Sequence, residues 1–261
     1  MDGPPRGLEV RARELGLRGP RGPVFHGVSL DAEPGSLIAL EGPSGSGRTC
    51  LLLTLTGRMR AGEGTASVGG MALPRHMGAV RRVAALAHVP GVTDLDPALT
   101  VGEHLRERAL SQRRFGDPLR GLPRPRAARR ERSSRIVDDA LSAARLDLDR
   151  LPKGPRTTVR DLERAEALRL SVALALLGRP RLLGVDDADL KLSPTERGEV
   201  WSLLTAIADS GTTVVVVCGH APGRAVTVPT RPEFGEPTAL AARHGAGRKE
   251  AGDGLAEAGR A

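Results

Sequence analysis

Apolar runs alternate with glycine-rich and polar stretches along most of the chain, and their lengths predict strands alternating with helices. Up to about Val68, short β-like runs are separated by glycine turns. The strand candidates are Ser36–Leu40 within this stretch, and then Val83–His88, Arg181–Val185 and Thr212–Val217. The last of these is rich in β-branched residues, which is typical of a strand buried in a parallel sheet.

Three longer stretches have a helical pattern. Cys50–Arg60 follows a glycine-rich loop, Glu196–Asp209 is amphipathic, and most of the stretch from Leu95 to Leu177 is helical in pattern. Alternating strands and helices predict an α/β core, and the stretch 95–177 predicts a helical subdomain inserted into it.

The 261 residues suffice for one domain and a tail. We expect the domain to span 1–230. Beyond Thr230 the chain is mostly Gly, Ala, Arg and Glu, which predicts a disordered tail over 231–261. Aromatic residues make up only 2% and Tyr is absent, so the core must consist of Leu, Val and Ala.

The sequence predicts a cytoplasmic protein without its own membrane span. The first residues lack the pattern of a signal peptide, and the longest apolar runs are too short to cross a bilayer. Cys50 and Cys218 have no metal-ligand spacing, so reduced thiols are expected. If the protein acts at a membrane, another chain must supply the spans.

The net charge of +8 is concentrated in one segment. Residues 106–135 hold eleven arginines and three acidic residues, which accounts for the whole excess, and three prolines there predict an irregular loop in the middle. Such a segment is either a patch for anionic lipid headgroups or nucleic acid, or a solvated insertion without a partner. Phe115 is its only aromatic residue, so it offers no platform for stacking bases, and no nucleic-acid partner is expected.

A phosphate-binding loop is predicted between the first long strand and the first helix. The motif GxxxxGK[ST] in that context cradles phosphates with backbone N–H groups and the helix N-terminus. The matching residues are Gly42, Pro43, Ser44, Gly45, Ser46, Gly47, Arg48 and Thr49, and the predicted nucleotide-binding set ends at Cys50. The Thr49 hydroxyl is a predicted Mg²⁺ ligand. Arg48 replaces the usual Lys and keeps the charge, but its planar fork is bulkier.

The segment from Leu176 to Asp187, LLGRPRLLGVDD, resembles the sequence ALLGRPRLLLLDEP of ABC ATPases. The motif order also resembles that family, from the phosphate loop through Leu99–Leu105 and the acidic strand end to the strand Gly211–Val217. The resemblance covers about 8–225, and several fragments resemble transporter-associated cassettes of high-GC bacteria. It implies the P-loop NTPase fold of an ABC cassette, with a mixed sheet core, that binds ATP and Mg²⁺.

The resemblance also implies roles for individual residues. Asp186 takes the place of the carboxylate that holds Mg²⁺, and Asp187 takes the place of the catalytic Glu. Asp187 is one methylene shorter, so it would lie farther from the γ-phosphate and slow the reaction. A plain turn after the strand is the alternative for this acidic pair. His88 occupies the position of the family's Gln, and His220 is the candidate switch histidine, although Gly219 is in register with it.

Other family positions are altered. The signature LSGGQ corresponds to residues 162–166, where Glu163 and Arg164 replace Ser and the first Gly. The D-loop Asp corresponds to Ser193. The aromatic residue that stacks on adenine falls near Gly19, where Phe25 is the nearest substitute.

The resulting hypothesis is an ATP-binding subunit of an ABC-type membrane transporter, located at the inner face of the membrane through a partner. Its expected partners are a transmembrane permease and a second cassette, identical or different. Hydrolysis by the self-paired chain is expected to be impaired. One alternative is a non-catalytic nucleotide-binding regulatory protein with the same fold. A nucleic-acid-associated cassette would need tandem cassettes or a DNA-binding arm, and the sequence shows neither.

Overall fold

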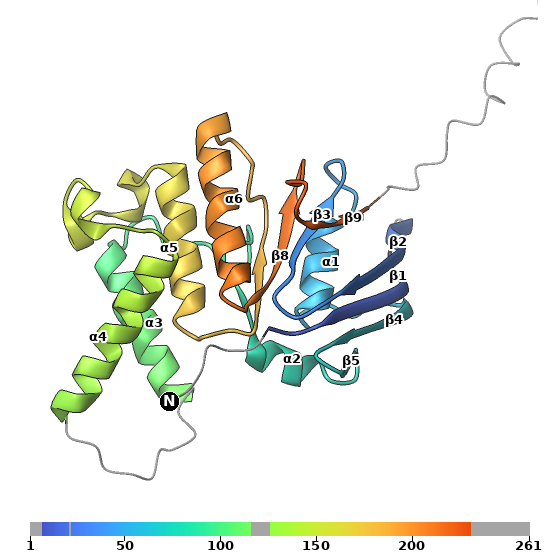
Figure 1. The fold of residues 1–261 in the computed structure, drawn as a ribbon, viewed down its shortest axis with the longest axis horizontal. Helices are drawn as coiled ribbons and strands as arrows, with labels where there is room; N and C mark the ends of the chain where they lie inside the picture. The colour runs from blue at the N-terminus through green and yellow to red at the C-terminus, as the bar shows by residue number, and fades with distance from the viewer. Residues whose placement is uncertain (1–6, 21, 116–125, 231–261) are drawn as a thin grey trace, which may run out of the picture.

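The computed structural model describes residues 7–20, 22–115 and 126–230. The expected tail, 231–261, and the middle of the arginine-rich insertion lie outside this part of the chain. Figure 1 shows two sheets with helices between and beside them. The α/β fold class predicted from the sequence is confirmed.

Five parallel strands form the central sheet in the order β6-β7-β8-β3-β9. They are β3 (Leu37–Glu41), β6 (Ala84–Leu86), β7 (Leu182–Val185), β8 (Thr213–Cys218) and β9 (Val226–Pro229). The first four were predicted to within two residues at each end. The fifth was not predicted, because β9 is an edge strand whose exposed side chains give no apolar run.

Four antiparallel strands form a second sheet in the order β2-β1-β4-β5. They are β1 (Val10–Gly19), β2 (Gly22–Ala32), β4 (Glu63–Val68) and β5 (Met71–Leu73). A mixed sheet was predicted for the core. The structure has parallel strands in one sheet and antiparallel strands in the other.

Helix α1 (Arg48–Leu55) lies between the two sheets (Figure 1). Because side chains alternate along a strand, Ile38 and Leu40 of β3 face α1 and the antiparallel sheet, while Leu37 and Ala39 face the cluster formed with α5 and α6. The predicted helix Cys50–Arg60 begins two residues earlier and ends at Leu55. Gly57 lies just beyond in a left-handed conformation, with φ of +74°, which stops the helix.

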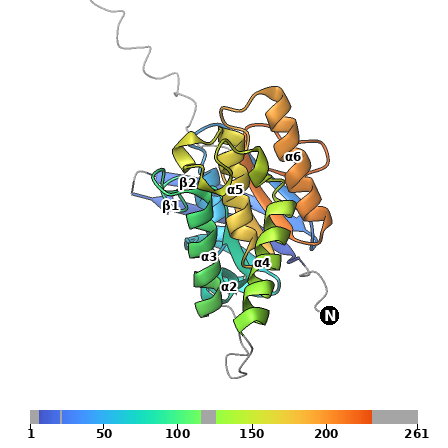
Figure 2. The same cartoon turned by 90° about the vertical axis from the view of Figure 1, so that its left-hand side faces the viewer.

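The other face of the parallel sheet is covered by α3 (Val101–Phe115), α4 (Arg126–Ala143), α5 (Arg164–Leu176) and α6 (Pro194–Asp209), which extend beyond it (Figure 2). Helix α2 (Met77–Val83) instead packs on the side of α1, where its Val80 belongs to the same apolar cluster. Short 3-10 turns at Leu148–Arg150, Gly154–Arg156 and Val159–Asp161 connect α4 to α5. Both ends of the arginine-rich insertion are thus helical, as parts of α3 and α4.

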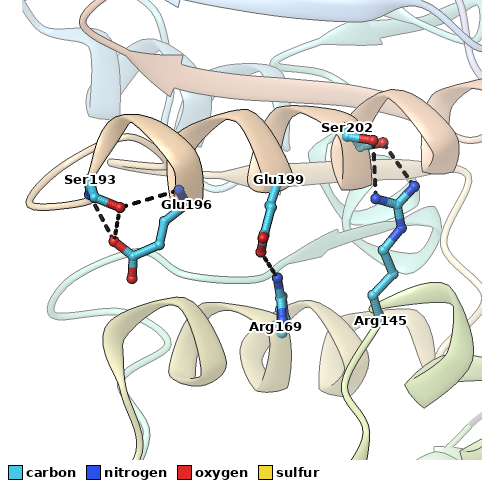
Figure 3. Close-up of polar contacts among 6 residues, drawn as sticks. All are labelled: Arg145, Arg169, Ser193, Glu196, Glu199 and Ser202. Atoms are coloured by element: carbon cyan, nitrogen blue, oxygen red, sulfur yellow. Dashed lines mark hydrogen bonds and ion pairs between the residues drawn. The ribbon is translucent and has the colours of Figure 1, made fainter.

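Polar contacts fasten α6 to the neighbouring helical segment (Figure 3). Arg169 of α5 forms an ion pair with Glu199, and Arg145 donates to the Ser202 hydroxyl at 3.0 Å. Ser193 caps α6 reciprocally with Glu196, and Pro194 occupies the first turn. The cap explains why α6 begins two residues before the predicted start at Glu196.

Candidate functional site

Two of the three glycines of the phosphate loop lie where a side chain would not fit. A Cβ on Gly42 would lie 2.4 Å from the Thr230 carbonyl oxygen, and one on Gly47 would lie 2.4 Å from that of Val24. Gly45 has a φ of +83° and open space around it. The loop therefore presents bare backbone at its tip while its base is held tightly by neighbouring strands.

The rest of the loop forms a closed turn between β3 and α1. The Ser46 amide donates to the Pro43 carbonyl at 3.2 Å, and Ser46 itself is fully buried. Its hydroxyl lies 2.7 Å from the Thr230 hydroxyl, just after β9. Pro43 and Ser44 are exposed at the tip. The predicted loop residues are thus brought together in one turn, and Thr230, which the sequence did not indicate, supports it.

Arg48 points toward the end of β8. Its Nη1 donates to the Cys218 carbonyl at 2.6 Å. This places a guanidinium, rather than the ammonium of the motif's usual Lys, at the carboxyl edge of the parallel sheet beside the loop.

Cys50 contributes little polar chemistry to the predicted set. Its side chain packs against the apolar cluster around α1. Burial raises the pKa of the Cys50 thiol, and the Asp186 carboxylate raises it further. The thiol is therefore protonated at neutral pH, and any contact with a nucleotide would come from the backbone.

The two predicted metal ligands lie in direct contact. Thr49 Oγ1 donates to Asp186 Oδ2 at 2.7 Å, which joins the first turn of α1 to the end of β7. Asp186 is 1% exposed, and its other oxygen accepts the Asp187 amide at 2.9 Å. Burial raises the pKa of Asp186 above its ordinary value, against the opposing effect of the Thr49 hydrogen bond. A hydroxyl and a carboxylate side by side are the oxygen donors that Mg²⁺ takes in phosphate sites.

His88 and Asp187 line a cavity of about 460 Å³ beside this pair. The backbone joins them closely, because the Asp186 amide donates to the His88 carbonyl at 2.7 Å. Asp187 has a left-handed backbone with φ of +46°, which is uncommon outside glycine and costs conformational energy. Burial lowers the pKa of His88, and Arg164 lowers it further, so its imidazole is neutral at pH 7.

His220 is held by its backbone rather than by its ring. Asp189 Oδ2 accepts the amides of Gly219 and His220 at 2.8 and 3.4 Å. Within the described part of the chain, no hydrogen bond joins the exposed His220 ring to Asp187. Sequence reasoning missed Asp189, although an acid inside the turn after the acidic pair was a usable signal.

The segment 162–166 is engaged within its own chain. The Glu163 and Glu166 side chains form a capping box at the start of α5, where the Glu163 amide donates to Glu166 Oε2 at 2.9 Å. Arg164 Nε donates to the Leu190 carbonyl at 2.7 Å. Both substituted positions therefore serve local structure in the isolated chain.

Phe25 is excluded as an adenine platform. Its side chain is 1% exposed and belongs to the core around α1. Gly19, at the family's aromatic position, pairs with Gly22 at the end of the β1–β2 hairpin.

Comparisons with known proteins identify the family of this chain. The family model described as ABC transporter matches residues 25–189, which is more than half of the chain. The chain belongs to the ABC transporter family. It is 30% identical over 193 residues to the Nod factor export ATP-binding protein I of Cupriavidus metallidurans, a match that covers 74% of the chain and 57% of that relative. It therefore spans little more than half the length of that relative.

A second relative and two solved structures extend the comparison. The chain is 31% identical over 212 residues to a probable anion import ATP-binding protein of Haloferax volcanii, covering 79% of the chain and 70% of the relative. The cassette MJ0796 in its dimeric post-hydrolysis state with ADP and Pi superposes with a TM-score of 0.62 at 20% identity, over 81% and 88% of the two chains. For cbiO1 of Clostridium perfringens, the TM-score is 0.63 at 16% identity, over 81% and 78%. These structures show the cassette fold of the family.

Within residues 7–20, 22–115 and 126–230, none of the helices is long and apolar enough to span a bilayer.

Proposed function

We propose that this chain is the ATP-binding subunit of an ABC-type membrane transporter, binding Mg-ATP on Gly42–Thr49 and coupling it to a transmembrane permease. The observation that carries the proposal is the Thr49–Asp186 hydrogen bond of 2.7 Å beside a loop of bare glycine backbone. Bound Mg²⁺ would neutralise phosphate charge there. The loop amides and Arg48 would hold the phosphates, and Thr49 and Asp186 would hold the metal.

In this proposal Asp187, His88 and His220 act near the γ-phosphate. Asp187 would orient the attacking water, and neutral His88 would bond water across the 460 Å³ cavity. Asp189 holds the segment that carries His220 next to the same strand ends.

We further propose that the productive partner is a second cassette with an intact signature segment. Glu163 would otherwise bring negative charge to the phosphates of the opposite chain. A pair of unit charges ~4 Å apart repels by about 4 kcal/mol at an effective dielectric near 20. An intact partner would complete one competent site with this chain's phosphate loop.

The decisive experiment combines two measurements on the full chain. Mg-ATP binding by the purified protein tests the nucleotide site. Affinity capture from detergent-solubilised membranes of the native host tests the transporter assignment, since an integral membrane permease and a second cassette should be recovered together. Absence of Mg-ATP binding overturns the proposal entirely.

The second candidate function is a non-catalytic nucleotide-binding regulator. It is favoured by Arg164, which bonds to the Leu190 carbonyl instead of leaving a glycine backbone free for a partner's phosphate. Nucleotide binding without recovery of a permease, and without turnover, distinguishes this candidate from the first.

We also propose that the protein resides in the cytoplasm at the inner membrane face, where the insertion 106–135 contacts anionic lipid. Arg106 and Arg132 are exposed, whereas Arg135 is paired with Glu131. Vesicle flotation of the Arg106→Gln/Arg132→Gln variant, with Arg150→Gln as control, tests the contact. Retention equal to that of the unmodified chain contradicts it.

A further inference from the structure

Three arginines lie on elements that meet at the edge of the sheet opposite the phosphate loop. Arg58 follows α1, half buried, and its guanidinium donates to the carbonyls of Thr56 at 2.8 Å and Ala84 at 3.4 Å. Arg108 of α3 donates through Nε to the Leu174 carbonyl at 3.2 Å. Arg81 is exposed in the last turn of α2.

The fold brings the elements that carry these side chains together. Helix α2 runs directly into β6, so Arg81 lies one helical turn before Ala84, the residue whose carbonyl holds Arg58. Helix α5 contacts both β6 and α3, which places Arg108 near the same strand. Figures 1 and 2 both show α2 near the lower part of α3.

The cluster is distinct from the nucleotide site. Arg58 lies beyond the C-terminal end of α1, whereas the phosphate loop precedes its first turn, and eight helical residues span about 12 Å. Ala84 opens β6, whereas Asp186 follows the end of the parallel strand β7. The cluster therefore lies at the amino edge of the sheet and the nucleotide site at the carboxyl edge.

The cluster carries positive charge without a carboxylate to balance it. Within the described part of the chain, no ion pair joins Arg58, Arg81 or Arg108 to an acidic residue. Burial lowers the pKa of Arg58, and Arg81 and Arg108 lower it further, so the charges repel one another through a partly buried region. Each guanidinium has five donors, and the carbonyl bonds use two of those on Arg58 and one on Arg108.

We propose that Arg58, Arg81 and Arg108 form a second anion site that binds a phosphate group. Three unit charges match a phosphate monoester, which carries about −1.5 to −2, better than a single carboxylate. Guanidinium forks also bind phosphate oxygens in pairs. The phosphate belongs either to a lipid headgroup or to a free phosphate in solution.

The test measures inorganic phosphate binding by calorimetry in the full chain with Arg48→Gln, which weakens the phosphate loop. In that background, Arg81→Gln and Arg108→Gln should each weaken binding about tenfold, because each removes charged hydrogen bonds. Arg82→Gln, an exposed neighbour, is the matched control and should leave affinity unchanged. Arg81 is exposed, so its variant should keep the fold, which circular dichroism checks.

Vesicle flotation then separates the two sources. A lipid headgroup is indicated if the unmodified chain floats with phosphatidic acid vesicles, floats less with phosphatidylglycerol vesicles, and no longer floats when Arg81→Gln is introduced. Phosphate binding that Arg81→Gln weakens, without vesicle retention, indicates free phosphate. The proposal is overturned if the Arg81→Gln and Arg108→Gln variants bind phosphate as tightly as Arg82→Gln. It is also overturned if Arg48→Gln alone abolishes phosphate binding. Mg-ATP binding is measured separately, and only that measurement tests the proposed function.

Discussion

The two halves of the candidate ATP site differ in what their residues do within this chain. At the phosphate loop, Gly45 stays open at the exposed tip and Thr49 meets the buried Asp186 beside it, so a bare backbone turn and a pair of oxygen donors lie next to each other. In the segment 162–166, Glu163 caps α5 and Arg164 bonds to the Leu190 carbonyl. The first half is organised for a ligand, whereas the second is organised for its own helix. The cassette fold can therefore keep its phosphate loop ready for a ligand while the signature segment, which would face a partner's nucleotide, stabilises its own helix.

The largest effect is expected at the metal ligands of the first half. Thr49→Ala combined with Asp186→Asn removes both oxygen donors, so the Mg²⁺ dependence of ATP binding should fall by about 100-fold or more. Titration of ATP affinity against Mg²⁺ measures it. Thr54→Ala and Asp209→Asn are matched controls, and a double variant with unchanged Mg²⁺ dependence contradicts the site assignment.

Restoring the family's signature residues in the segment 162–166 should raise activity. Glu163→Ser, Arg164→Gly and Ala165→Gly together remove the repelling charge and free the backbone, so ATP-dependent dimerisation and turnover should rise about tenfold or more. The same triple variant should unfold at a lower temperature, because it places two glycines in the first turn of α5 and loses the Arg164 bond. Glu163→Gln removes the charge alone. Equal turnover in the triple variant and the unmodified chain, or brisk turnover by the unmodified homodimer, contradicts the comparison.

A smaller effect concerns the base of the nucleotide. With Phe25 buried and Gly19 at the family's aromatic position, stacking worth roughly 1–3 kcal/mol is missing. ATP and GTP should therefore compete within about tenfold of each other. Competition binding against a fluorescent nucleotide measures the ratio, and a hundredfold preference for ATP would show that another group contacts adenine.

The smallest effect is on stability in the absence of ligand. Because burial raises the pKa of Asp186, its contribution to stability is fully present below the unfolded pKa and is lost as the pH rises through the folded value. Asp186→Asn should therefore stabilise the nucleotide-free chain at pH 7.5 and change it little at pH 4. Thermal denaturation measures this, at about 2–4 °C in Tm per kcal/mol. A variant less stable than the original at pH 7.5 contradicts it.

Much of the fold was predictable because local patterns carried it. The valines of β8 and the apolar residues of β3 and β7 predicted buried strands, whereas the Ser193–Glu196 cap that sets the start of α6 was not predicted. The short exposed strand β9 and the helix α2 carried no comparable pattern.

The sequence by itself determined the order of motifs, the glycines of the phosphate loop, the acidic pair at 186–187 and the altered signature, because each depends on residue type and spacing within a few positions. Tertiary structure alone decided that Thr230 supports Ser46, that Asp189 holds Gly219, that Phe25 is buried, and that the elements carrying Arg58, Arg81 and Arg108 meet at one edge of the sheet. These contacts join residues up to 184 positions apart. Their formation depends on how sheets and helices stack, and no local pattern encodes that stacking.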